Sequence, residues 1–213
     1  MDFIDKDIEE YARLFTSPES EVMQDLNRDT HIKKLMPRML SGHMQGAFLS
    51  MISQMIQPTT VLEIGTYTGY SAIALAKGLK ENGKLYTLEF NEEHEEMATK
   101  YFKKAGLKDK IELIIGNAVE IIPTLDLQWD LVFIDADKGN YGVYYDLIID
   151  NVASGGMIIA DNVLWSGKVL LDDSELDEDT KAIKAFNKKV KEDERVENIL
   201  FPFRDGLFLI RKK

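Results

Sequence analysis

Two apolar runs in the second half of the chain end abruptly in polar side chains. Phe133-Ile134 is followed by Asp135-Ala136-Asp137-Lys138, and Ile159-Ala160 is followed by Asp161-Asn162. If both runs are neighbouring strands of a parallel sheet, Asp135, Asp161 and Asn162 meet at its carboxyl edge. Two carboxylates and an amide carbonyl are hard oxygen ligands that suit Mg²⁺, Mn²⁺ or Ca²⁺ and not Zn²⁺. The pattern predicts a divalent-cation site, and solvated strand ends or helix caps are the alternative.

A glycine-containing turn follows the first apolar run and reads Glu63-Ile64-Gly65-Thr66-Tyr67-Thr68-Gly69-Tyr70-Ser71. Glycines at a strand-to-helix turn let the backbone approach a ligand, and the next helix begins with free N–H groups. The turn lacks both the G-x-G-x-x-G dinucleotide fingerprint and the Gly-Lys-Ser/Thr of a P-loop. Glu63 would repel a pyrophosphate, so the turn favours a cationic or zwitterionic ligand over a nucleotide phosphate. A plain tight turn is the alternative interpretation.

Two further strand ends carry polar residues. Glu89 lies 26 residues after Glu63, where an acid can accept hydrogen bonds from both hydroxyls of a ribose. Asn117 and Ala118 follow the third apolar run. They fit either the wall of an adenine pocket or, for Asn117, the N-cap of a helix.

The elements that would position these residues alternate regularly from residue 60 onward. Short, continuously apolar runs are typical of parallel strands covered on both faces. Repeated strand–helix units predict an α/β fold with a doubly wound, seven-stranded, mostly parallel sheet. The last two strands are joined by residues 202–206 without a helix, which predicts an antiparallel hairpin at the sheet edge. The predicted strands are 60–64, 85–90, 111–115, 131–135, 156–160, 196–201 and 207–211, and the predicted helices are 69–80, 92–105, 117–124, 140–151 and 179–193.

The residues before 60 predict helices only. Apolar residues at helical spacing predict a helix over 2–16 and another over 44–56. Between them, Ser17-Pro18-Glu19 resembles an N-cap with proline at the first helical position, opening a helix to about His31. We therefore predict one domain over 1–213, with a helical cap over 1–57 and an α/β core over 58–213. The acidic linker 162–178 is long for this fold, and we expect a lid or a disordered loop there.

Composition excludes several classes of protein. The 213 residues contain no cysteine, which rules out disulfide scaffolds, zinc fingers, iron–sulfur proteins and thiol nucleophiles. Lys and Arg number 26 against 37 Asp and Glu, and the net charge of −11 argues against a general nucleic-acid binder. No apolar stretch approaches the ~18 residues of a membrane span, and the acidic start is unlike a secretory signal. We expect a soluble cytoplasmic protein.

Taken together, these segments resemble the metal-dependent class I S-adenosylmethionine O-methyltransferases, the catechol and caffeoyl-coenzyme A family. The resemblance runs from about residue 30 to the end of the sequence. It rests on five segments: 39–42 with Gly46, 61–71, 133–141, 160–165 and 204–206. It implies a Rossmann-like methyltransferase fold with added N-terminal helices, and it favours a homodimer.

The resemblance also implies a role for each matching residue. Mg²⁺, or another divalent cation, would be bound by Asp135, Asp161 and Asn162. Lys138 would be the general base that acts on the acceptor hydroxyl, with Asp135 beside it as a catalytic residue. S-adenosylmethionine would contact Met39 and Ser41 at its methionine part, Glu63, Gly65, Ser71 and Asp135 near its amino-acid end, Glu89 at its ribose, and Asn117 and Ala118 at its adenine.

Two positions depart from the catechol branch. That branch has tryptophan where this chain has Asp137, and it has a further acid in the region that here reads Ile199-Leu200-Phe201-Pro202. Both departures bring the chain closer to the caffeoyl-coenzyme A-like bacterial branch.

The resulting hypothesis is methyl transfer from S-adenosylmethionine to a hydroxyl of a catechol-type or caffeoyl-type small aromatic. One alternative is methylation of a hydroxylated uridine in tRNA, for which Arg28, Lys33, Lys34 and Arg38 could form a local basic patch. Another alternative is a cofactor-binding module without catalysis, which the complete set of Asp135, Lys138, Asp161 and Asn162 disfavours. A nicotinamide dehydrogenase is disfavoured by the missing fingerprint.

Overall fold

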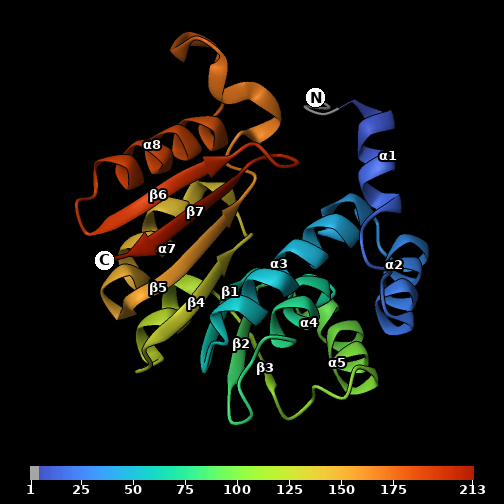
Figure 1. Ribbon diagram of the computed structural model, residues 1–213. Helices are drawn as coiled ribbons and strands as arrows, with labels where there is room; N and C mark the ends of the chain where they lie inside the picture. Colours follow the sequence, from blue (N-terminus) through green and yellow to red (C-terminus); the bar gives the residue numbers. More distant parts are fainter. Residues whose placement is uncertain (1–4) are drawn as a thin grey trace.

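The computed structural model describes residues 5–213 and contains one seven-stranded sheet (Figure 1). The strand order is β3-β2-β1-β4-β5-β7-β6. β1 to β5 pair in parallel, whereas β7 pairs antiparallel with both β5 and β6. The predicted doubly wound sheet with its antiparallel C-terminal hairpin is confirmed. The strands are β1 Thr60–Ile64, β2 Lys84–Glu89, β3 Ile111–Ile115, β4 Trp129–Ile134, β5 Val152–Asp161, β6 Val196–Phe201 and β7 Leu207–Lys212.

Helices cover both faces of the sheet because each central strand is apolar on both sides (Figure 1). Val61, Phe133 and Ile159 pack on the face covered by α3 Gly42–Ile56, α4 Tyr70–Ala76 and α5 Glu95–Lys104. Their chain neighbours Leu62, Val132 and Ile158 pack on the other face. That face is covered by α6 Ala118–Ile121, α7 Tyr141–Ile148 and α8 Glu178–Glu192. The sheet is therefore the middle layer of three.

The two N-terminal helices differ in how they are held. α2, Glu21–Lys33, buries Met23, Leu26 and Thr30. α1, Lys6–Leu14, buries none of its residues. Figure 1 shows α1 and α2 at the margin of the molecule. The part of the predicted first helix before Asp5 lies outside the described residues. Among residues 5–213, each helix is too short or too polar to cross a bilayer.

The predicted start of α2 is wrong. Ser20, not Ser17, precedes the helix, and its carbonyl accepts the amides of Met23 and Gln24 at 2.9 and 3.0 Å. Pro18 consequently lies in the connection before the helix. The competing signal was local: two serines flank the proline, and only the second has its carbonyl in place for the first helical hydrogen bonds.

Most other boundaries shift by one or two residues, but several differ by more, and α4 ends at Ala76, four residues before the predicted end at 80. β5 begins at Val152, four residues earlier than predicted, because its first residue pairs with Trp129 across an irregularity in register. Helical segments begin or end in short 3₁₀ turns, such as Glu92–His94 before α5 and Ile149–Asn151 after α7. The predicted linker 162–178 contains the 3₁₀ segments Trp165–Leu170 and Asp173–Glu175.

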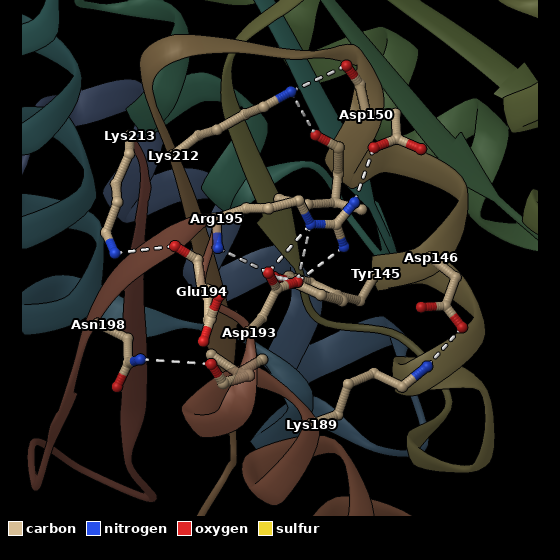
Figure 2. Close-up of polar contacts among 12 residues, drawn as sticks. Tyr145, Asp146, Asp150, Lys189, Asp193, Glu194, Arg195, Asn198, Lys212 and Lys213 are labelled. Atoms are coloured by element: carbon tan, nitrogen blue, oxygen red, sulfur yellow. Dashed lines mark hydrogen bonds and ion pairs between the residues drawn. The ribbon is translucent and has the colours of Figure 1, made fainter.

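A polar cluster ties α7, α8 and β6 together at the edge of the sheet that lies away from the predicted site (Figure 2). Asp193 follows α8 and accepts the Arg195 guanidinium at 2.7 and 3.0 Å. Asp193 also accepts the Tyr145 hydroxyl at 2.9 Å, and Arg195 reaches Asp150 at 2.8 Å. The cluster fixes the end of α8 against α7.

Candidate active site

A cavity of about 1240 Å³ opens at the carboxyl ends of β1, β2, β4 and β5. This is where open α/β sheets bind ligands, at the point where the strand order reverses between β1 and β4. Typical small-molecule sites are about 300–1,000 Å³, so the cavity has room for two molecules side by side. Its wall also includes residues of α1, of segment 36–44 and of the turn 203–205.

All but one of the predicted site residues line this cavity. The lining includes Met39, Ser41, Gly65, Ser71, Glu89, Asn117, Ala118, Asp135, Lys138, Asp161 and Asn162. The exception is Glu63, which is fully buried inside β1 and is not part of the wall. Its Oε2 accepts the Thr87 hydroxyl at 2.5 Å, while Oε1 has no partner. Burial, with added repulsion from Asp135 and Glu89, raises the pKa of Glu63 to about 8.

One wall of the cavity brings the predicted metal ligands together. Asp161 is buried, and its Oδ2 accepts the Gln45 amide at 2.6 Å while its Oδ1 accepts the backbone amide of Asn162 at 2.7 Å. Burial and the negative charge of Asp135 raise the pKa of Asp161 to about 6. Each carboxylate oxygen keeps a lone pair beyond these bonds, so the pair can still bind a cation. A cation between Asp135 and Asp161 would remove their mutual repulsion.

The turn before β7 fixes Asn162 from the opposite side. Asn162 has a left-handed backbone, with φ of 58°, which asparagine tolerates better than most residues. The backbone amides of Val163 and Leu164 donate to the carbonyls of Gly206 and Asp205 at 3.2 and 3.0 Å.

Across residues 5–213, no three histidine, cysteine or acidic side chains are grouped to hold a metal. The predicted set has two carboxylates and an amide, a donor set that fits a hard cation.

Lys138 is 8% exposed and lies beside these carboxylates. Its Nζ is 3.2 Å from Asp135 Oδ1 and 2.7 Å from the hydroxyl of Tyr141. The Tyr141 hydroxyl is also 3.0 Å from the carbonyl of Asp161, and burial raises the pKa of Tyr141 well above its usual value. The ring of Trp165 lies 5.7 Å from Nζ. Tyr141 therefore connects the lysine to the backbone of β5.

Gly65 allows β1 and β4 to approach each other at the mouth of the cavity. It has a φ of +99°, and a Cβ at this position would lie 2.1 Å from the carbonyl oxygen of Asp135. Only glycine meets both conditions without moving the backbone. The glycine signal in the sequence thus has a specific cause, the close approach of Asp135.

The far wall of the cavity is built around Glu89. Its two oxygens accept the backbone amides of Tyr67 and Asn91 at 2.7 and 2.8 Å. His94 Nδ1 lies 3.2 Å from Glu89 Oε1, and the His94 ring meets the Tyr67 ring edge-on at 4.9 Å. Burial raises the pKa of Glu89, but His94 and the two amides outweigh burial and leave the pKa below its usual value. Glu89 is thus held as a carboxylate facing the cavity.

Asn117 has both of the roles that the sequence left open, part of the pocket wall and N-cap of a helix. It lines the cavity, and its Oδ1 accepts the amide of Val119 at 3.1 Å as the N-cap of α6. The side chain that starts the helix therefore also forms part of the wall.

Comparison with known proteins assigns this architecture to a family. The sequence profile of the O-methyltransferase family matches residues 4–213. The chain belongs to the O-methyltransferase family. The predicted O-methyltransferase activity is confirmed at this level.

Individual relatives support the assignment. Caffeoyl-CoA O-methyltransferase of Mesembryanthemum crystallinum is 36% identical over 91% of this chain and 80% of its own. Tricin synthase 2 of Oryza sativa subsp. japonica is 34% identical over 79% of this chain, and the match spans 61%, less than two thirds, of that relative. The crystal structure of an O-methyltransferase from Bacillus cereus in complex with SAH has a TM-score of 0.90 and 28% identity, covering 97% of each chain.

Several residues of this O-methyltransferase site escaped prediction. Gln45 holds Asp161, Tyr141 contacts Lys138, and His94 contacts Glu89. Gln45 and Asp161 are 116 residues apart, so no short motif joins them. His94 and Tyr141 lie close in sequence to their partners, and a search for polar residues one helical turn beyond each strand end would have found them. The contribution of Ile8, Glu9 and Ala12 of α1 to the wall had no sequence signal.

Proposed function

We propose that this O-methyltransferase transfers a methyl group from S-adenosylmethionine to a hydroxyl of a catechol-type or caffeoyl-type small aromatic, with Mg²⁺ as cofactor. The observation that carries the proposal is the grouping of Asp135, Asp161, Asn162 and Lys138 on one wall of a cavity whose other wall presents Glu89. The relatives named for caffeoyl-CoA and the SAH-bound neighbour support the acceptor and the donor respectively.

The far wall suits the nucleoside of the methyl donor. Glu89 faces the cavity as a carboxylate and can accept hydrogen bonds from both hydroxyls of a ribose. Asn117 and Ala118 would line the adenine beside it. Met39 and Ser41 would close over the methionine part, and Ser71 at the start of α4 would meet its amino-acid end.

The opposite wall suits a divalent cation and an aromatic hydroxyl. Asp135, Asp161 and Asn162 would hold the cation. When bound, it lowers the pKa of a phenolic hydroxyl from about 10 and fixes the acceptor oxygen. Asp161 stays in place because Gln45 and the backbone of Asn162 occupy one lone pair on each oxygen.

Lys138 handles the proton that leaves the acceptor. A proton taken up at Nζ would be shared with Asp135 Oδ1 and the Tyr141 hydroxyl, both within hydrogen-bonding distance. Trp165 beside Nζ presents a flat apolar surface to an aromatic acceptor. Alignment of acceptor and donor by the two walls can contribute up to about 7–11 kcal/mol of barrier reduction.

A methyl-transfer screen tests the proposal. Catechol, caffeate, caffeoyl-CoA and a tRNA containing 5-hydroxyuridine are incubated with S-adenosylmethionine in Mg²⁺ and, separately, in EDTA. We expect Mg²⁺-dependent methylation of an aromatic acceptor. Methylation of the tRNA alone would overturn the acceptor class, and full activity of Asp161→Ala in EDTA would overturn the metal mechanism. A protein that binds S-adenosylmethionine but methylates no acceptor would be the non-catalytic module.

Three further expectations complete the proposal. We propose a homodimer, a cytoplasmic location and a single domain in which residues 1–57 cap the α/β core. Size-exclusion chromatography with light scattering measures the first of these directly.

A further inference from the structure

A second cavity of about 650 Å³ opens beside the active site, between α2 and the segment 37–43. Four arginines and two histidines line it: Arg13, Arg28, Arg38, Arg204, His31 and His43. Glu19 is the sole carboxylate among the lining residues, all of which belong to the described part of the chain. This concentration of positive charge stands out in a chain with a net charge of −11.

The carboxylate of Glu19 is already engaged. It accepts the hydroxyl of Tyr70, and this contact contributes, after burial, to raising the pKa of that tyrosine. Glu19 carries a single negative charge, and the Tyr70 hydroxyl that it accepts is neutral. Glu19 can therefore neutralise at most one of the four guanidinium groups.

Two acids of α2 close to Arg28, Asp25 and Asp29, form their ion pairs with lysines, although Asp25 also interacts electrostatically with Arg28. Asp25 pairs with Lys104, and Asp29 pairs with Lys33 and Lys100 at 2.7 and 3.0 Å. Within residues 5–213, no hydrogen bond or ion pair of Arg28 is found.

Of the other three arginines, Arg38 and Arg13 keep most of their charge available, whereas the charge of Arg204 also acts on Asp161 in the active site. Arg38 has no hydrogen-bond or ion-pair partner within residues 5–213. Arg204 donates to neutral oxygens, the carbonyl of Ser41 and Gln45 Oε1. Arg13 reaches Glu9 at 3.5 Å, with both side chains at least half exposed.

The two histidines are oriented by backbone carbonyls. His31 Nδ1 lies 2.9 Å from the carbonyl of Asn27, and His43 Nε2 lies 2.7 Å from the carbonyl of Ser17. Since a carbonyl only accepts, each of these ring nitrogens carries its hydrogen. The second nitrogen of each ring is an acceptor in the neutral imidazole and becomes a donor to an anion when the ring is protonated.

We propose that this cavity, the cationic pocket, binds a phosphate group. Planar guanidinium groups match the oxygens of phosphate with two parallel hydrogen bonds, and a concave cationic surface concentrates the field on an anion. Arg38, Leu40 and Arg204 line both this pocket and the active-site cavity, so a phosphate bound here lies next to the acceptor. The phosphate either is carried on the methyl acceptor, a source that rests on the proposed function, or is free in solution.

Calorimetric titration with inorganic pyrophosphate, in EDTA and saturating SAH, tests the pocket itself. We expect saturable binding to the full chain that weakens about tenfold or more in the double variant Arg13→Ala/Arg28→Ala, through the loss of charge-assisted hydrogen bonds. Neither residue lines the active-site cavity. Arg211→Ala is the matched control, because Arg211 pairs with Glu197 on β7 and β6 outside the pocket.

Unchanged pyrophosphate affinity in the double variant, or none in the natural sequence, would overturn the proposal. Retained SAH affinity and an unchanged thermal transition show that the double variant is folded. Its effect on pyrophosphate then reports on the pocket alone.

Kinetics distinguish the two sources of phosphate. If the acceptor carries it, pyrophosphate competes with caffeoyl-CoA, and the double variant raises the KM for caffeoyl-CoA more than that for caffeate. If the anion is free, pyrophosphate changes the turnover of caffeate. If neither acceptor is methylated, the proposed acceptor class fails, while the titration still decides whether the pocket binds phosphate.

Discussion

Asp161 has both carboxylate oxygens hydrogen-bonded, yet it stays close enough to Asp135 for their charges to repel. A neutral amide of nearly the same shape removes the charge and keeps one of the two acceptor oxygens, while its NH2 group cannot accept the N–H of Gln45 or Asn162. The individual residues of this site can therefore be tested one at a time by conservative changes.

Asp161→Asn should reduce Mg²⁺-dependent methyl transfer by about 100-fold, since it removes one charged cation ligand. The SAH dissociation constant should change far less, because Asp161 lies on the wall opposite Glu89. Steady-state kinetics and calorimetry measure the two effects. Asp173→Asn, an exposed acid that pairs with Lys184, is the control. Equal losses of SAH affinity and rate would contradict a role confined to the cation.

His94→Phe should weaken SAH binding by about tenfold or more, because the largely buried Glu89 would lose the imidazole nitrogen that lies 3.2 Å from its Oε1. His94→Gln, which can still donate to Glu89, should recover most of the affinity. Calorimetric titration of both variants with SAH decides the point. If phenylalanine and glutamine give the same affinity, His94 does not act through Glu89.

Gly65→Ala should destabilise the protein by more than the ~1–3 kcal/mol expected for a strained backbone, and should abolish SAH binding. The new Cβ would clash with the carbonyl oxygen of Asp135. In addition, alanine would have to adopt the positive φ of Gly65, which side chains disfavour. Gly106→Ala is a matched control, because Gly106 also has a positive φ of +71° but nothing within 4 Å of the new Cβ. Urea unfolding compares the two, and equal costs would exclude the clash with Asp135.

The sequence predicted residues of this site wherever a strand end and a polar side chain coincide. Asp135, Asp161 and Glu89 follow directly from that rule. Gln45 and Arg204 could not be found in this way, because their contacts join α3 to the turn before β7 across most of the chain. Glu63 was predicted to line the cofactor pocket, but its side chain is fully buried, accepts the Thr87 hydroxyl and is not among the residues that line the cavity.

Among the elements, α8 depends on a carboxylate at an unfavourable position. Asp193 follows the C-terminus of the helix, where a negative charge opposes the helix dipole. Arg195 offsets this with a two-point contact (Figure 2) and, against the effect of burial, lowers the pKa of Asp193 below its usual value.

Asp193→Asn should therefore lower the free energy of unfolding at pH 7 by about 1–3 kcal/mol. A carboxyl whose pKa is lower in the folded protein stabilises above its unfolded pKa of about 4, and this stabilisation is lost as the pH falls further. The difference between the variant and the natural sequence should thus shrink below about pH 4. Urea unfolding at pH 7, 5 and 3 measures it.

Asp146→Asn provides the comparison for this pH series. Asp146 pairs with Lys189 in the same cluster, but both side chains are exposed, so the change should cost less than about 1 kcal/mol (Figure 2). Equal costs for the two variants would show that the contact of Asp193 with Arg195 has no special weight.

Element boundaries were predictable where the apolar pattern had one interpretation. β1 and β3 match their predicted ranges because each mainly apolar run, interrupted by Glu63 in β1 and by Glu112 in β3, ends in turn residues. The start of β5 could not be read, since Ala153, Ser154 and Gly155 lack the apolar pattern and Val152 is placed only by pairing with Trp129. The start of α2 was predicted wrongly because Ser17 and Ser20 are both suitable N-cap residues, and only Ser20 precedes the helix.

At the scale of the whole molecule, the active-site cavity is lined by residues from the strand ends, from α1, from segment 36–44 and from the turn 203–205, so a bound ligand contacts many parts of the fold. A ligand that binds only the folded protein at 100 times its Kd stabilises it by about 2.7 kcal/mol. For a domain of this size, SAH should then raise the Tm by about 5–10 °C. Differential scanning fluorimetry measures the shift, and no shift at saturating SAH would contradict the proposed donor site.

The reversal of strand order between β1 and β4 has a consequence for how such a protein can change over evolutionary time. Apart from Met39 and Ser41, which precede β1, the side chains proposed to hold the donor follow β1, β2 and β3, whereas those proposed to hold the cation and acceptor follow β4 and β5. The two sets come from two consecutive stretches of the gene. Mutations in the later stretch can therefore redirect the enzyme to a new acceptor while the inherited donor pocket stays intact.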